Sequence, residues 1–207
     1  MTGVARLFTA LWPARAALAA LHRELEADGG WPPEGWRATP VVRWHVTLGF
    51  HGEAEPGIQA RLLEARAAEL PAPRLRLAGA VSFPQVAAVG VVPAGEAGAA
   101  ALAELVAAAG GDPASFRGHL TVARTSRRRD EPPAAGPLGR HAGPWWCPAE
   151  VCLVRSELTT AGPRYTVLHR VPLYTRPHSA AGPGRARGGS PARGVRPAAA
   201  RPAAPRE

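Results

Sequence analysis

Two short segments of the chain repeat one pattern of side chains. Residues 45–50 read His, Val, Thr, Leu, Gly, Phe, and residues 119–124 read His, Leu, Thr, Val, Ala, Arg. In a β-strand, side chains two residues apart point to the same face. Each segment therefore predicts a strand that buries its apolar residues and presents an imidazole beside a hydroxyl on the other face.

The repetition favours one shared catalytic site over two unrelated surface histidines. A single histidine on a strand is more often a packed or half-exposed side chain than a catalyst. His45 and His119, however, each have a threonine at the same offset, Thr47 and Thr121. Two imidazoles on opposite sides of a reacting atom can supply a general base and a general acid near neutral pH. We therefore expect the two His–Thr faces to meet across a groove.

The apolar spacing along the chain predicts an α+β fold with more strands than helices. Period-2 runs predict strands at 4–11, 43–50, 75–83, 86–92, 117–124, 149–156 and 164–174, helical spacing predicts helices at 14–27, 57–69 and 95–109, and 28–40 and 125–144 read as loops. Gly79, inside the third strand, is typical of a β-bulge. The two His–Thr strands each follow a helix and lie in opposite halves. We therefore expect two pseudo-symmetric lobes of antiparallel β-sheet, with flanking helices, around a central groove.

The net charge of +9 over 207 residues is weak evidence for a polyanionic partner. The chain has no Lys and no Asn, a bias typical of a GC-rich genome rather than of one function. Seven arginines and one glutamate lie in 176–207, so this segment carries six of the nine net charges. Its Pro, Ala, Gly and Arg residues have little to bury. We expect residues 1–175 to form the folded domain and 176–207 a disordered tail.

Nothing in the sequence indicates a metal, a cofactor or a membrane segment. Cys147 and Cys152 match neither a zinc-site spacing nor a redox motif, so we expect reduced, structural thiols. No phosphate-binding glycine loop or dinucleotide fingerprint is present. No run approaches the roughly 20 apolar residues needed to cross a bilayer, and the N-terminus does not read as a signal peptide. The expected protein has no cofactor, no metal and a cytoplasmic location.

Beyond the two His-x-Thr segments, the chain resembles the two-histidine (2H) phosphoesterases, and within them the RNA 2′,3′-cyclic phosphodiesterases, also called 2′-5′ RNA ligases. The resemblance lies in segments 6–11, 44–48, 116–124 and 155–158, followed by Gly162 and Tyr165, and it spans roughly residues 4–174. The chain departs from the family at 51–52, where His-Gly replaces Leu-Gly, and at Gly118, where many members have Pro. His51 would lie roughly 20 Å from His45 along an extended strand, so we do not expect it to be a third catalyst.

The resemblance implies an enzyme that hydrolyses RNA 2′,3′-cyclic phosphate ends to 2′-phosphomonoesters without a metal. His45 and His119 are the implied catalytic residues. Our working assignment makes His45 the acid and His119 the base, and the opposite order stays open. Thr47 and Thr121 would donate hydrogen bonds to the non-bridging phosphate oxygens.

Two further residues are candidates for substrate binding. Arg124 matches the arginine of the family motif and would bind the phosphate, although strand parity puts it off the His–Thr face, so only a local twist would bring it in. Phe8, on the opening strand, is a candidate for stacking a base. Packing in the core is the alternative for this aromatic side chain.

Other functions stay open on the sequence. The chain could act on small cyclic nucleotides instead of RNA ends, could bind nucleotides without catalysis, or could run the reverse 2′-5′ ligation. The expected partners are RNA with 2′,3′-cyclic phosphate ends or related nucleotides, with no membrane contact, and the expected state is a monomer.

Overall fold

The computed structural model describes residues 3–126, 136–160 and 162–174. Its elements, in chain order, are β1 (Ala5–Leu11), α1 (Arg15–Ala27), β2 (Arg37–Ala38), a 3₁₀ turn (Val41–Arg43), β3 (Val46–Ala54), α2 (Pro56–Ala67), β4 (Leu75–Phe83), β5 (Val86–Pro93), α3 (Gly95–Ala108), β6 (His119–Arg124), α4 (Gly136–Arg140), β7 (Glu150–Thr159) and β8 (Gly162–Pro172). Every predicted strand and helix is present, in the predicted order. The short elements β2 and α4 lie in stretches that we predict as loops.

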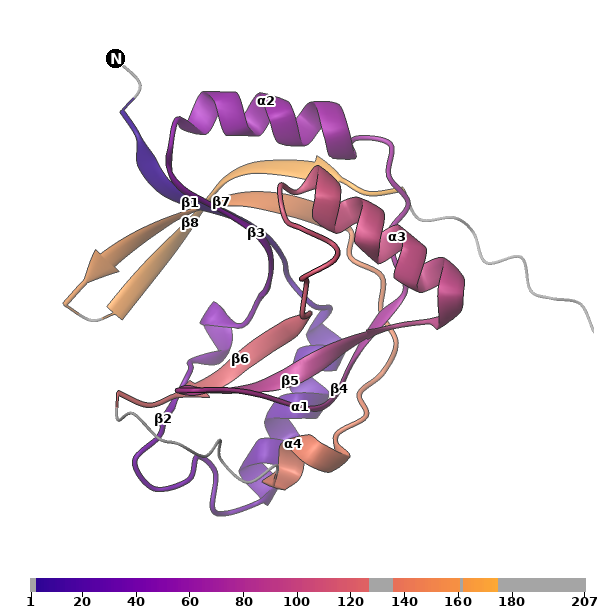
Figure 1. Cartoon of the computed structure of the whole chain (residues 1–207). Helices are drawn as coiled ribbons and strands as arrows, with labels where there is room; N and C mark the ends of the chain where they lie inside the picture. Colours follow the sequence, from indigo (N-terminus) through magenta and orange to yellow (C-terminus); the bar gives the residue numbers. More distant parts are fainter. Residues whose placement is uncertain (1–2, 127–135, 161, 175–207) are drawn as a thin grey trace, which may run out of the picture. The chain divides into compact units, whose positions relative to one another are not determined.

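The strands form one curled antiparallel sheet in the order β4-β5-β6-β3-β1-β7-β8, with β2 also paired to β6. In Figure 1, β1, β3, β7 and β8 form the upper group and β4, β5 and β6 the lower group. The α+β class and the two lobes of antiparallel sheet are therefore confirmed, as two halves of one sheet. The bulge predicted at Gly79 is also confirmed, because the β4–β5 register shifts between Leu77 and Ala80.

The strand pairing within one half of the sheet is long, whereas the pairing between the two halves is short. Within the first half, β1 and β3 pair along their whole common length, from Ala5 opposite Ala54 to Leu11 opposite Val46. Between the halves, β3 and β6 meet where Val46 lies opposite Leu120. This junction is the place where the two His–Thr strands come together.

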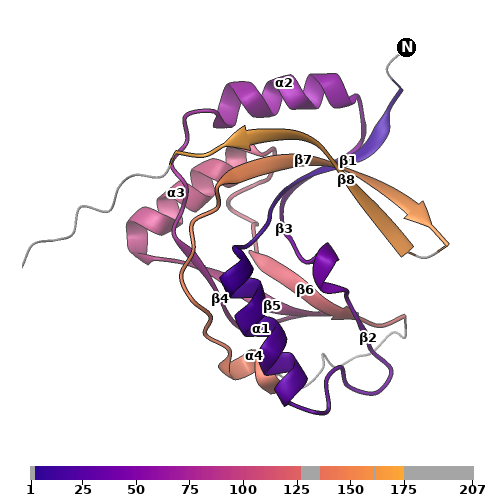
Figure 2. The ribbon, with the colours of Figure 1, turned by 180° about the vertical axis from the view of Figure 1, so that it is seen from behind.

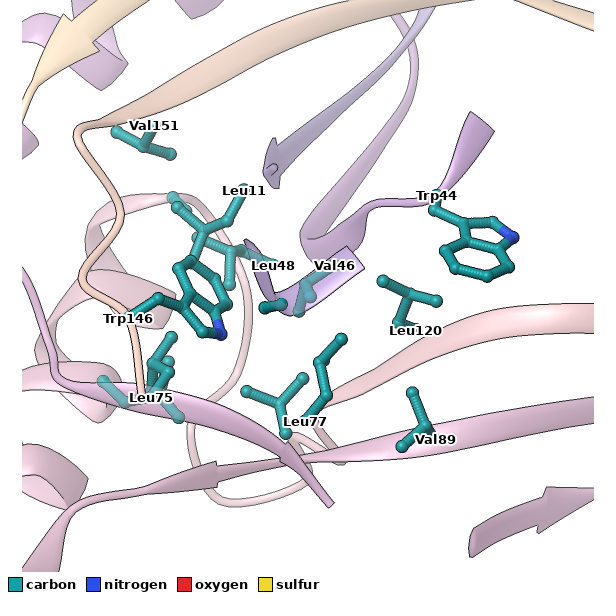
Figure 3. Close-up of a cluster of buried hydrophobic side chains, with 14 of the residues drawn as sticks. Leu11, Trp44, Val46, Leu48, Leu75, Leu77, Val89, Leu120, Trp146 and Val151 are labelled. Carbon is teal, nitrogen blue, oxygen red and sulfur yellow. The ribbon is translucent and has the colours of Figure 1, made fainter. Parts of the chain in front are cut away.

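A hydrophobic core beneath the junction belongs to both halves. Val46 and Leu48 of β3 lie in it beside Leu120 of β6 and Leu77 of β4 (Figure 3). Burying one such side chain contributes about 1.5–3 kcal/mol. Helices α1 and α4 pack on β4, α2 on β7 and β8, and α3 on β3 and β5, an arrangement that can be followed from behind in Figure 2. The core thus fixes the apolar face of both His–Thr strands and leaves their opposite face for the site.

The turn after α3 is held directly against β3. The hydroxyl of Thr9 donates a buried hydrogen bond to the carbonyl oxygen of Ala109 over 2.6 Å. Gly49 allows this close approach, because a Cβ atom at this position would lie 2.6 Å from that same oxygen and 2.8 Å from backbone atoms of Gly110 and Gly111. The segment that leads from α3 to β6 is thereby anchored on the first His–Thr strand.

Among the described residues, no helix combines the length and the apolar character needed to cross a membrane. The predicted tail at 176–207 lies outside the described residues.

We predict that Gly49→Ala destabilises the fold by about 1–3 kcal/mol, because the added methyl group meets backbone that cannot move aside without disturbing the turn after α3. Urea unfolding measures the change as a lower midpoint at an unchanged slope. Gly30→Ala is the matched control. The nearest atom to a Cβ there is a side-chain oxygen at 3.8 Å, so its change should stay within about 0.5 kcal/mol. Equal stability of the two variants would contradict the close-packing argument.

Candidate active site

The predicted alternation of buried and accessible side chains is present on both strands. His45, Thr47, His119 and Thr121 are half-buried, and Val46, Leu48, Leu120 and Val122 between and beside them are buried. His45 itself lies just before the first residue of β3. Each strand therefore offers an imidazole and a hydroxyl on the face opposite the core.

The structure brings these four polar side chains into one cavity of about 1020 Å³. Val46 and Leu120, which join the half-sheets, are each the residue directly after a histidine. This register places His45 and His119 on the far side of the sheet from the core, close enough that the charge of His119 lowers the pKa of His45. Arg124 also lines the cavity.

The two imidazoles are held in the same way. Nδ1 of His45 lies 2.6 Å from the carbonyl oxygen of Arg43, and Nδ1 of His119 lies 2.7 Å from the carbonyl oxygen of Arg117. Since a carbonyl can only accept, each Nδ1 must carry the hydrogen and donate it. Nε2 is therefore the nitrogen of each ring that can take up a proton, or release one when the ring is charged.

His45 is surrounded by aromatic rings. Its ring centroid lies 5.1 Å from that of Phe8, 5.0 Å from that of Tyr165 and 5.8 Å from that of Trp12. Such contacts hold a ring by packing and partly remove it from water. The orientation of His45 is thus fixed on both sides, by a backbone hydrogen bond and by aromatic packing.

The base-stacking role predicted for Phe8 does not fit the structure. Phe8 is 4% exposed, because β1 lies between β3 and β7 and the Phe8 ring belongs to a small buried cluster. The other buried members of this cluster are Ala10, Cys152 and Val154. The ring contacts Phe50 as well as His45 and Tyr165. Phe8 is therefore a core residue, as in the alternative interpretation, and its ring packs against the ring of His45.

The surroundings of His119 are more polar. Its ring lies 4.7 Å from that of Phe83, and the guanidinium of Arg117 covers the same phenyl ring at 4.9 Å. A cation over an aromatic face is a favourable arrangement. One histidine therefore lies in an aromatic setting and the other beside a cation.

Burial lowers the pKa of both histidines below the ordinary value of 6.5. The carbonyl of Arg43 acts against this shift at His45, and the carbonyl of Arg117 acts against it at His119. The positive charge of Arg124 lowers both pKa values further. The site is thus electropositive, and an anion placed between the rings would favour their protonated forms.

A β-bulge explains how Arg124 reaches the cavity in spite of its position in the sequence. In the pairing of β5 with β6, Ala87 lies opposite Ala123 and Ala88 opposite Thr121, so Val122 has no direct partner. Val122 and Ala123 are consecutive buried residues. This extra residue reverses the alternation and turns Arg124 to the side of Thr121. The local twist that the sequence analysis requires is therefore present.

The same bulge occurs in the first half. In the pairing of β1 with β3, Thr9 lies opposite Gly49 and Ala10 opposite Thr47, which leaves Leu48 without a direct partner. Phe50 consequently takes the position that Arg124 takes in the other half. It is 77% exposed and lines the cavity. Phe50 is a site residue that the sequence analysis misses, although its equal offset from His45 is a signal that could have found it.

His51 takes no part in the cavity. Its ring lies over Gly110, and its pKa is lowered by burial and by the charge of Arg66. The expectation that it is not a third catalyst fits this placement.

The described residues hold no group of three or more His, Cys, Asp and Glu residues that could bind a metal ion. Cys147 and Cys152 are both free thiols, and burial raises the pKa of Cys152 to about 12. At that pKa the thiol stays protonated and is a poor nucleophile.

Comparisons with known proteins identify the family. The family model of the LigT-like phosphoesterases matches residues 11–93. The crystal structure of TT0787 of Thermus thermophilus is 30% identical and aligns over 82% of this chain and 98% of its own, with a TM-score of 0.57.

The chain belongs to the LigT-like phosphoesterases. The resemblance to the 2H phosphoesterases is thereby confirmed. E. coli LigT complexed with ATP has the same fold, at 24% identity and a TM-score of 0.59 over 84% of this chain and 99% of LigT. E. coli LigT complexed with phosphate aligns over the same shares at 23% identity, with a TM-score of 0.61. No curated protein gives a significant match.

We predict that an NMR pH titration of this phosphoesterase gives midpoints below 6.5 for the rings of His45 and His119, since burial disfavours their charged forms. The unfolded chain then binds more protons than the folded one as the pH falls below about 6.5. The free energy of unfolding should therefore decrease over that range. Each signal is assigned by its disappearance in His45→Gln or His119→Gln. A midpoint at or above 6.5 for both rings would contradict the electrostatic description.

Proposed function

We propose that this LigT-like phosphoesterase hydrolyses RNA 2′,3′-cyclic phosphate ends to 2′-phosphomonoesters by metal-independent acid–base catalysis. The proposal rests on one observation: His45 and His119 line the same cavity, and each has Nδ1 bound to a backbone carbonyl and Nε2 left for proton transfer. In-line displacement at phosphorus needs a base on one side and an acid on the other. Two histidines at the starts of the neighbouring strands β3 and β6 can supply both.

In the proposed reaction, water attacks phosphorus and the bond from phosphorus to the 3′ oxygen breaks. The base is His119, whose Nε2 accepts a proton from the water. The acid, His45, gives the proton on its Nε2 to the departing 3′ oxygen. A 2′-phosphomonoester remains, and exchange with solvent returns both histidines to their starting protonation states.

The neighbouring polar groups are suited to the charge on the phosphate. Thr47 and Thr121 line the cavity beside the two histidines, so their hydroxyls can donate to the non-bridging oxygens. A preorganised donor of this kind contributes on the order of 2–4 kcal/mol to the barrier reduction. Arg124 adds a positive charge whose effect reaches both imidazoles.

The cavity is also suited to a nucleotide. Its volume of about 1020 Å³ exceeds what a bare phosphate group fills, and the exposed ring of Phe50 offers a face on which a base can stack. The related E. coli LigT has been crystallised with phosphate, with 3′-AMP, with ATP and with NADP+. These ligands support a nucleotide bearing a phosphate as the substrate class.

We predict that the chain opens a 2′,3′-cyclic phosphate at the end of an oligoribonucleotide in the presence of EDTA. His45→Ala and His119→Ala should each lower kcat by about 10²–10⁴-fold, the usual contribution of a general acid or base. Chromatography of the labelled product measures the rate and identifies the monoester.

His22→Ala is the control, because this histidine lies on α1 and does not line the cavity. It should leave the rate unchanged. Loss of activity with the chelator would contradict the metal-independent mechanism. A near-normal rate in either catalytic variant would remove that histidine from the chemistry.

The assignment of His45 as the acid has a physical argument. His45 is the more buried of the two rings and is lined by aromatic groups, so it feels the charge of a bound anionic diester more strongly than His119 does. An anion raises the pKa of a nearby imidazole. Burial lowers the pKa of His45 in the free protein, so this assignment requires the bound diester to raise it above that of His119.

A substrate with a better leaving group tests this assignment. In a cyclic nucleotide whose bridging 3′ oxygen is replaced by sulfur, the thiolate departs without protonation because of its lower pKa. We predict that His45→Ala loses at least tenfold less activity on this substrate than on the oxygen ester. His119→Ala should lose as much activity on either. The reverse pattern would make His119 the acid.

A further inference from the structure

Strand β2 adds no side chain of its own to the hydrophobic core. It consists of Arg37 and Ala38, both exposed, and it pairs with the end of β6 so that Arg37 lies opposite Arg124 and Ala38 opposite Ala123. Side chains directly opposite each other on antiparallel strands share a face. Two like charges so placed repel each other and destabilise the pair. A strand that buries nothing thus holds two cations side by side.

This placement is rigid. The backbone N–H of Thr39 donates to the carbonyl of Val122 over 2.8 Å, which continues the pairing with β6. The indole N–H of Trp44 donates to the carbonyl of Thr39, also over 2.8 Å. Trp36, directly before β2, is buried in the core. Arg37 is therefore held beside β6 and does not sit on a free loop.

Both arginines line the active-site cavity, and in the described part of the chain no carboxylate pairs with either. Asp112 is the acidic residue among the described cavity-lining residues. Its carboxylate already accepts hydrogen bonds from the hydroxyl of Ser115 and the backbone N–H of Ala114. Within the described ranges, Arg37 and Arg124 are thus positive charges that face a cavity without a partner of opposite sign.

The two cations lie at the end of β6, beyond its junction with β3. β3 pairs with β6 at Leu120, and β2 takes up the pairing at Ala123 and Arg124. Arg124 lies four residues beyond Leu120, roughly 13 Å at about 3.3 Å per residue. Arg124 therefore lies further along β6 than the junction with β3, and Arg37 lies beside it on the neighbouring strand β2.

We propose that Arg37, together with Arg124, forms a subsite for a second phosphate of the substrate. This inference rests on the proposed function and specifies its substrate class: a nucleotide that carries a phosphate on its 5′ side in addition to the cyclic phosphate. The second phosphate is either the phosphodiester that links the terminal nucleotide to an RNA chain or a free 5′-phosphate. An anion there offsets the repulsion between the two guanidinium groups.

Three substrates separate these cases: adenosine 2′,3′-cyclic phosphate, the same nucleotide with a 5′-phosphate, and a diadenosine nucleotide that ends in a 2′,3′-cyclic phosphate. In the wild-type protein, kcat/KM should be higher for the two substrates with a second phosphate. In Arg37→Gln, this preference should fall at least fivefold, mainly through KM. Arg23→Gln, which removes an exposed arginine of α1 outside the cavity, should keep the wild-type preference.

The outcomes distinguish the subsite from the proposed function. Equal wild-type rates on all three substrates, or an Arg37→Gln preference equal to that of the wild type, would overturn the subsite and leave the hydrolase standing. If only the dinucleotide is preferred over the mononucleoside cyclic phosphate, the occupant of the subsite is the phosphodiester. If the nucleotide with a 5′-phosphate is preferred to the same extent, the subsite accepts either kind of second phosphate.

If the wild-type protein hydrolyses none of the three, the proposed function fails and binding tests the subsite. A labelled diadenosine nucleotide with a 3′-phosphate should then bind Arg37→Gln at least fivefold more weakly than the wild type. The slope of log affinity against log salt should decrease by about 0.7, the value for one contact with a single strand. Equal affinity and equal slope would overturn the subsite.

Discussion

The junction of the two halves of the sheet, where Val46 lies opposite Leu120, fixes how the two His–Thr strands lie relative to each other. The arrangement of the site depends on this junction. One backbone hydrogen bond contributes only about 0.5–1.5 kcal/mol, whereas each buried leucine or valine beneath the junction contributes about 1.5–3 kcal/mol. The shared core therefore holds the halves together, and the strand pairing sets their register. Because His45 and His119 each precede one residue of this pair, the same register that closes the core also brings the two imidazoles together on the opposite face.

The symmetry of the backbone contrasts with the chemistry of the side chains. Both halves have the His-x-Thr strand, the Nδ1–carbonyl hydrogen bond and the bulge one residue after the threonine. The rings that enclose His45 are aromatic, whereas the charges of Arg124 and Arg117 both act on His119. Burial lowers the pKa of both histidines, but only one of them is also enclosed by rings. Equal scaffolds thus give two imidazoles with different responses to an anion.

The sequence predicts those features that depend on local periodicity. The alternation around His45 and His119 is visible in the chain itself, so the strands, their accessible faces and the four polar side chains can be predicted. The position of Arg124 cannot be predicted in this way, since a bulge is defined by the partner strand, and Val122 loses its partner only when β5 and β6 are aligned. Phe8 is mispredicted for a related reason. Its burial depends on the pairing of β7 with β1, in which Phe8 lies opposite Val154, a residue more than 140 positions away in the sequence. Strand β2 is too short to show any periodicity.

In the proposed reaction, the duplicated bulge has a consequence for the product. The positions of two imidazoles on a pseudo-two-fold backbone do not by themselves distinguish the 2′ oxygen from the 3′ oxygen, because turning the cyclic ester over exchanges them. Phe50 on one side and Arg124 on the other break that equivalence, since one attracts the flat face of a base and the other a negative charge. In the proposed reaction, the two residues that follow the bulges therefore orient the ester, and this orientation sets which oxygen lies next to the acid.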